Sequence, residues 1–135
     1  MTIQYKNQGF SLTTTGTTSV LTAPANGRCL VKQIQAHNGS SGSAVNLATQ
    51  VTDTSASATF RIDNAAIAAN TTRQIISQTL VLEEGDILKM TAGTANEIQG
   101  IVSYAHLTAR KKTDKLFAIL YKLGNFNYGY NTLQI

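Results

Sequence analysis

The chain has 135 residues, a length that fits one domain with a modest core. Only 13% of its residues are charged, well below the usual quarter, and its single cysteine excludes an internal disulfide and a cluster of metal-bound thiolates. No apolar run approaches the length of a membrane span, and the first residues lack the apolar core of a signal peptide. We therefore expect synthesis in the cytoplasm and no membrane partner.

The charge is unevenly distributed along the chain. Residues 1–109 contain six Lys or Arg and six Asp or Glu, whereas residues 110–135 contain five Lys or Arg and one Asp, which accounts for the net charge of +4. Five of the nine Phe and Tyr residues also lie in 110–135. The sequence therefore predicts a neutral body over residues 1–109 and a basic, aromatic C-terminal arm over residues 110–135.

The body has the pattern of an all-β domain. Short apolar or alternating segments are separated by turn-rich clusters at intervals of roughly ten residues. About eight strands of about five residues each predict an antiparallel β-sandwich that is jelly-roll-like. In chain order, the expected strands are 8–14, 19–23, 29–38, 44–51, 58–63, one or two within 73–82, then 86–92 and 98–107.

Alternation within these segments predicts the core. In CLVKQIQAHN, Leu30, Ile34 and Ala36 are expected on one face, although Lys32 interrupts that face. In ATFRID, the residues expected to point inward are Ala58, Phe60 and Ile62. The larger side chains expected in the core are Phe10, Phe60, Leu80, Leu82, Leu88 and Met90.

The stretch LVLEEGDILKM raises the question of a catalytic or metal site, because Glu83, Glu84 and Asp86 lie within four positions. Gly85 can adopt the positive φ of a tight reversal, and Asp86 can accept hydrogen bonds from nearby backbone amides. The two glutamates would point to opposite faces, and the calcium-loop pattern is absent. We therefore predict a solvated hairpin tip.

The remaining reactive residues form no catalytic constellation. His37 and His106 have no partner at ligand spacing, and Cys29 is expected to be a small buried hydrophobe. Motifs for a nucleophilic serine, a phosphate loop or a dinucleotide are absent. The sequence therefore predicts no catalytic residue, no metal and no cofactor, and hence no enzyme.

A glycan-binding module is an alternative for a β-sandwich. Such sites usually present exposed aromatic side chains, and the body has four Phe or Tyr residues and no Trp. Tyr5, Tyr104 and the loops at 39–43 and 94–97 are the candidates to face a glycan or receptor.

The arm contains the segment TDKLFAILYKLG, which predicts an amphipathic helix with Thr113 as N-cap and Gly124 as its stop. A buried strand is the alternative, because LFAILY is uninterrupted. In both cases the apolar side chains must dock on the body or on a neighbouring subunit. The basic run RKK before this segment is expected to be a solvated linker, not a nucleic-acid site. The residues expected to bind a partner are Leu116, Phe117, Ile119, Leu120, Tyr121, Leu123, Phe126, Tyr128 and Tyr130.

Two segments carry a family resemblance: VLTAPANGRCLVKQIQAHNGSSGSAVNLATQVTD and AIAANTTRQIISQTLVLEEGDILKMTAGTAN. The turn LTAPA, the strand around VKQIQAHN, the run AANTT and the segment LVLEEGDILKM resemble a small structural protein of tailed bacteriophages, including cyanobacterial ones. The resemblance covers about residues 6–107, and the arm departs from the compact form of that family.

The resemblance implies a non-enzymatic virion component, made in the bacterial cytoplasm and present in several copies. It implies a capsid decoration (cement) protein or, alternatively, a neck or tail-fibre component. The expected partners are the major capsid protein or a neck or tail protein, together with further copies of this chain. By analogy with other jelly rolls on capsids, the expected oligomer is a trimer.

Overall fold

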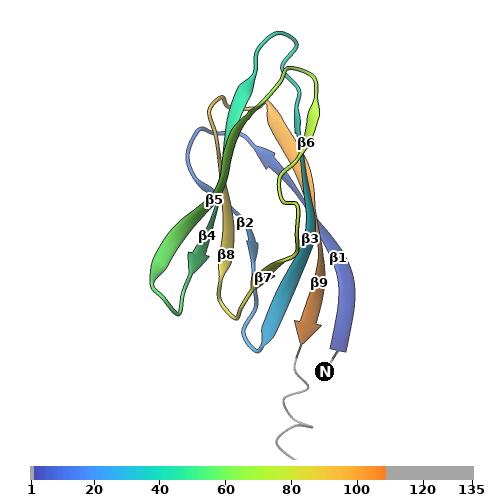
Figure 1. Cartoon of the computed structure of the whole chain (residues 1–135), viewed down its shortest axis with the longest axis vertical. Coiled ribbons are helices and arrows are strands. Elements are labelled where there is room, and N and C mark those ends of the chain that lie inside the picture. Colours follow the sequence, from blue (N-terminus) through green and yellow to red (C-terminus); the bar gives the residue numbers. More distant parts are fainter. Residues whose placement is uncertain (1, 109–135) are drawn as a thin grey trace, which may run out of the picture.

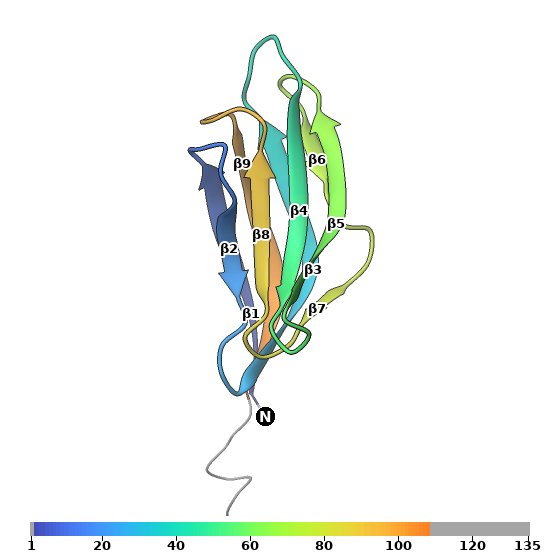
Figure 2. The same ribbon diagram turned by 90° about the vertical axis from the view of Figure 1, so that its left-hand side faces the viewer.

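The computed structural model describes residues 2–108, which form nine strands in two antiparallel sheets (Figure 1). One sheet has the order β1-β9-β3-β6, with β7 also paired to β3, and the other has the order β2-β8-β4-β5. Figure 2 shows the second sheet in front of the first. The strands are β1 (Thr2–Leu12), β2 (Thr18–Thr22), β3 (Gly27–Asn38), β4 (Val45–Asp53), β5 (Ala58–Ile67), β6 (Thr72–Gln74), β7 (Leu80–Leu82), β8 (Ile87–Ala92) and β9 (Ile98–Thr108).

This architecture confirms the predicted jelly-roll-like β-sandwich. Strands β6 and β7 both pair with β3, β6 near its end and β7 near its beginning, so they occupy one position in the sheet. Strands β4 and β5 are paired neighbours in the same sheet, whereas the connections β1–β2, β2–β3, β3–β4, β5–β6, β7–β8 and β8–β9 cross between the sheets. Such crossing connections place strands distant in sequence side by side.

Strand β3 contains a bulge that corrects the predicted inner face. The pairing of β3 with β9 shifts between Val31 and Gln33, so that Lys32 is an extra, exposed residue. Before the bulge Cys29 and Val31 are buried, and after it Ile34 is buried. Leu30, which was expected beside Ile34, therefore lies on the outer face. The lysine that interrupts the apolar pattern marks the point where the alternation changes phase.

The predicted core of β5 is wrong at two positions. Phe60 is 54% exposed and Ile62 is 40% exposed. Because β5 is the outermost strand of its sheet, an inward side chain has a neighbouring strand on one side only. Ile62 also falls at a bulge, because Asp63 pairs with Thr49 while Arg61 pairs with Gln50.

The other predicted core residues lie where the alternation placed them. Leu82, Leu88 and Met90 are fully buried, and Phe10 and Leu80 are partly buried against the same core.

A bidentate ion pair adds a polar link between the sheets, since Arg73 of β6 binds both carboxylate oxygens of Asp63 of β5 at 2.8 Å.

Gly100 permits a close approach at the centre of the first sheet. It pairs with Phe10 of β1, and a Cβ at position 100 would lie 2.6 Å from Phe10 Cζ and would also collide with the carbonyl oxygen of Gln35. Only glycine lets the aromatic ring and the neighbouring backbone come this close.

We expect Gly100→Ala to lower the free energy of unfolding by about 1–3 kcal/mol, because the added methyl group overpacks the site. Gly9→Ala is the matched control, since a Cβ there would have as its nearest contact the Gly100 carbonyl oxygen at 3.9 Å. Urea titration of both variants measures the difference. Equal unfolding midpoints for the two variants would contradict the packing described.

Candidate binding surface

The turn at Glu83–Asp86 is not the solvated hairpin tip that the sequence predicts. It joins β7 of one sheet to β8 of the other, and Asp86 is only 5% exposed. The expected backbone geometry is confirmed, because Gly85 has a φ of +84°. A local sequence pattern shows that a chain reverses, but it does not show whether the next strand joins the same sheet.

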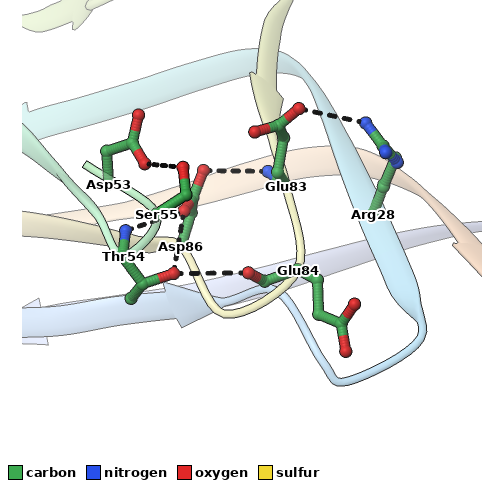
Figure 3. A network of polar contacts seen from close by, with 7 residues as sticks. All are labelled: Arg28, Asp53, Thr54, Ser55, Glu83, Glu84 and Asp86. Carbon is green, nitrogen blue, oxygen red and sulfur yellow. Dashed lines mark hydrogen bonds and ion pairs between the residues drawn. The ribbon is translucent and has the colours of Figure 1, made fainter. Parts of the chain in front are cut away.

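Asp86 ties this crossing connection to the turn after β4 (Figure 3). Its Oδ1 accepts hydrogen bonds from the backbone amide of Thr54 at 3.1 Å and from the Thr54 hydroxyl at 3.4 Å. Its Oδ2 accepts from the backbone amide of Glu83 at 3.0 Å. The buried carboxylate is therefore satisfied by groups of the fold itself, as a structural aspartate requires.

The two glutamates have structural partners in the turn between β2 and β3 and at the start of β3. Glu83 forms an exposed ion pair with Arg28 at 3.2 Å, and Glu84 Oε2 accepts from the amide of Asn26 at 2.8 Å. Figure 3 shows Glu83 pointing toward Arg28 and Asp86 toward Thr54. Among residues 2–108 there is no group of three or more His, Cys, Asp or Glu side chains arranged to hold a metal ion.

Replacing Asp86 by alanine should lower the free energy of unfolding by about 1–3 kcal/mol, because the amides of Thr54 and Glu83 would lose their acceptor. Glu84→Ala is the control, since its carboxylate is exposed and water can replace it at Asn26. Thermal or urea unfolding of the two variants provides the comparison. A loss for Glu84→Ala as large as that for Asp86→Ala would refute this role of Asp86.

The shifted pKa values reflect burial and structural hydrogen bonds. Burial raises the pKa of the Cys29 thiol and of the Tyr104 hydroxyl. A hydrogen bond from the Ser55 hydroxyl, with the amide of Ala56, lowers the pKa of Asp53, and the bond to Asp63 raises that of Arg73. Cys29, buried as predicted, is thus kept as a neutral thiol and not as a nucleophilic thiolate.

The Cys29 thiol should react with a disulfide reagent at mildly alkaline pH much more slowly than free cysteine, because both burial and the raised pKa suppress the thiolate. Full reactivity should return in urea. Rapid reaction of the folded protein would contradict the burial of this side chain.

The residues considered for a glycan site do not form one site, although two of the candidate loops adjoin. Tyr104 is buried, whereas Tyr5 is exposed on β1 near the arm exit. The two candidate loops do adjoin, since the amide of Gly39 donates to the carbonyl oxygen of Glu97 at 2.8 Å. They lie at the end of the sandwich opposite the N-terminus (Figure 1). Between the loops and Tyr5, the outer face holds a hollow of about 280 Å³ lined by Gln35, His37, Thr72, Gln99, Gly100 and Ile101.

A continuous row of apolar side chains crosses the outer face of the β1-β9-β3 sheet. Tyr5 of β1 pairs with Ala105 of β9, Ala105 pairs with Leu30 of β3, and Leu30 pairs with Val81 of β7. Directly paired residues share one face of a sheet, so these four side chains lie side by side. Two residues further along, Ile3 pairs with Leu107 on the same face, and Leu107 pairs on its other side with Arg28. We call this set the outer apolar row: Ile3, Tyr5, Leu30, Val81, Ala105 and Leu107.

The outer apolar row is open to solvent at both ends. Tyr5 is 84% exposed, Ile3 57% and Val81 49%, while Leu30 and Leu107 are half-buried. The exposed side chains lie on β1 and β7 at the two edges of the sheet, and the buried Ala105 and half-buried Leu30 lie between them. Exposed large apolar side chains grouped on one face are typical of an interaction surface. Sequence reasoning missed it because each strand contributes one or two residues and only the register aligns them.

The C-terminal arm starts beside this row. Thr108, the last described residue, pairs with Thr2 on one side and with Gly27 on the other. The chain neighbours of Gly27 bind the two glutamates, Asn26 to Glu84 and Arg28 to Glu83. All nine predicted partner-binding residues, which fall between Leu116 and Tyr130, lie outside the described residues.

No helix in the described part is long and apolar enough to cross a membrane.

No protein-family model and no curated protein matches this chain. Several solved structures show a distant likeness to it. A chain of the Bacillus endospore appendages, a family of disulfide-linked pili, is 6% identical over 79% of this chain and 87% of that chain, with a TM-score of 0.47. A chain of the virus-like particle of the extra small virus of the prawn Macrobrachium rosenbergii is 10% identical over 82% of each chain, with a TM-score of 0.40.

A chain of the infectious bursal disease virus Gt strain is 14% identical over 79% of this chain and 33% of that chain, with a TM-score of 0.31. These neighbours are β-rich proteins of pili and virus particles. At these identities and TM-scores the likeness assigns neither a family nor a function to this chain.

Proposed function

We propose that this protein is a non-enzymatic structural protein of a tailed-phage virion, which decorates the capsid and stabilises the particle through protein–protein contacts. The observation that carries the proposal is the outer apolar row, placed where a 27-residue apolar and basic C-terminal segment leaves the sandwich. The resemblance of residues 6–107 to structural proteins of tailed phages supports the same function.

The described body suits a building block better than a catalyst. Asp86 and Asp63 are satisfied by partners from the fold, and Glu83 and Glu84 bind the β2–β3 turn. The Cys29 thiol is buried and neutral. These groups hold turns and sheets together, which leaves the surface as the functional part of the body.

The arm supplies the second half of the contact. Its predicted partner-binding residues include seven aliphatic or aromatic side chains within 116–126, too apolar to be stable in water. Ordering such a segment costs roughly 1–2 kcal/mol per residue in backbone entropy, so it is stable only where contacts offset that cost. An assembled particle offers those contacts, either on the major capsid protein or on further copies of this chain.

A neck or tail position is the alternative, and it would use the same surface. A glycan or receptor site is not favoured, because Tyr5 and the paired loops at 39–43 and 94–97 lie at opposite ends of the sandwich. The copy number per particle separates the two positions. On the order of hundreds of copies indicates the capsid, whereas about six to eighteen indicates the neck or tail.

Deleting residues 111–135 should leave a folded body that no longer joins particles, because the strands and core described here end at Thr108. Circular dichroism and urea unfolding check the fold of the truncated protein. Quantitative mass spectrometry of particles purified from cells that make it measures incorporation. Incorporation at the level of the full-length chain would refute the role of the arm.

A further inference from the structure

We propose that the outer apolar row receives the segment Leu116–Tyr121 (LFAILY) of a second copy of this chain, so that subunits are joined by exchanged arms. This inference rests on the proposed assembly function and adds the receiving surface and the identity of its occupant. Its support comes from the position of the row, from the charges around it and from the direction in which the chain leaves β9.

The apolar character of the outer face is confined to the end from which the arm leaves. Toward the other end of the same face, the residues paired across β9, β3 and β6 are polar: Ser11, Gln33, Gln35, His37, Thr72, Gln74 and Gln99. Ile101 is the apolar residue among them and is 37% exposed. An apolar partner segment of about six residues therefore has one complementary apolar site on this face, next to β1 and β7.

The charges at this end complement the base of the arm. Glu84, bound to the amide of Asn26, and the Glu83–Arg28 ion pair lie on either side of Gly27, which pairs with Thr108. The arm begins with Arg110, Lys111 and Lys112 and carries the whole net charge of +4. Because Arg28 already neutralises Glu83, the attraction comes from the Glu84 carboxylate, and it favours docking of a basic segment at this end more strongly at low salt than at high salt.

The direction of β9 favours a second copy over the same chain. Strand β9 runs off the end of the sheet, and residues 109–113 contain no Gly, Pro, Asn, Asp or Ser, the residues most common in tight turns. A return to its own row would require the chain to fold back at once across the strand it has just left. The seven residues 109–115 can instead span up to about 24 Å, which is enough to reach an adjacent subunit.

The test uses engineered cysteines in the full-length protein. Val81→Cys is placed in the row and Leu120→Cys in the arm, and the two variants are co-expressed with different affinity tags. We expect mild oxidation to yield a disulfide-linked heterodimer of the two chains. The wild-type protein is the blank, because its Cys29 is buried.

Matched positions control for chance collisions and for misfolding. Phe60→Cys lies on the other sheet with a similar exposed fraction and should not link to Leu120→Cys. Tyr5→Cys, at the opposite end of the row, is a second receiving position if Val81→Cys does not fold. Thermal melting of each variant verifies the fold before oxidation.

Two results would overturn the proposal. In the first, a chain carrying both Val81→Cys and Leu120→Cys closes an internal disulfide while the mixture of single variants forms none, so the arm binds its own body. In the second, folded variants at positions 5 and 81 form no link with the arm. Neither result bears on the proposed function, because that is tested separately by the incorporation of the chain that lacks residues 111–135 into particles.

Discussion

Ala105 is paired on both sides, with Tyr5 of β1 and with Leu30 of β3, and this double pairing of β9 is the constraint on which the rest depends. Eleven residues of β9 are in register with each neighbour. That register buries Val102 and Ile98 on one face and aligns the outer apolar row on the other. A shift by one residue would exchange the two faces, so the core and the outer apolar row are both set by the register of β9.

Polar groups link the two sheets, and one of them, Asp86, is a residue that the sequence offers as a candidate for chemistry. Asp86 joins the β7–β8 connection to the turn after β4, and Arg73 joins β6 to Asp63 of β5. Because buried polar groups need partners, these bonds fix the turns in one conformation. A body rigid at its turns presents the outer apolar row in a constant geometry, which a repeated contact between subunits requires.

The fold class follows from the sequence because period-two alternation is strong in β4 and β8, the two inner strands of their sheet. The sequence does not predict correctly which side chains of β3 and β5 are buried, because Lys32 and Ile62 lie at bulges and β5 is an edge strand. The turn at Gly85 was predicted from its residues. Its crossing from one sheet to the other was not, because that depends on which strands, distant in sequence, pair with β7 and β8. The outer apolar row was not predictable from local sequence for the same reason, whereas the docking role of the arm stays a prediction, because its residues lie outside the described part of the chain.

The central claim is that this chain associates through its C-terminal arm and does not act alone. Sedimentation velocity of the purified full-length protein, over a range of concentrations and beside the chain that lacks residues 111–135, tests it most directly. The account predicts a discrete oligomer for the full-length chain and a monomer for the shortened one. A full-length protein that sediments as a monomer at every concentration would contradict it.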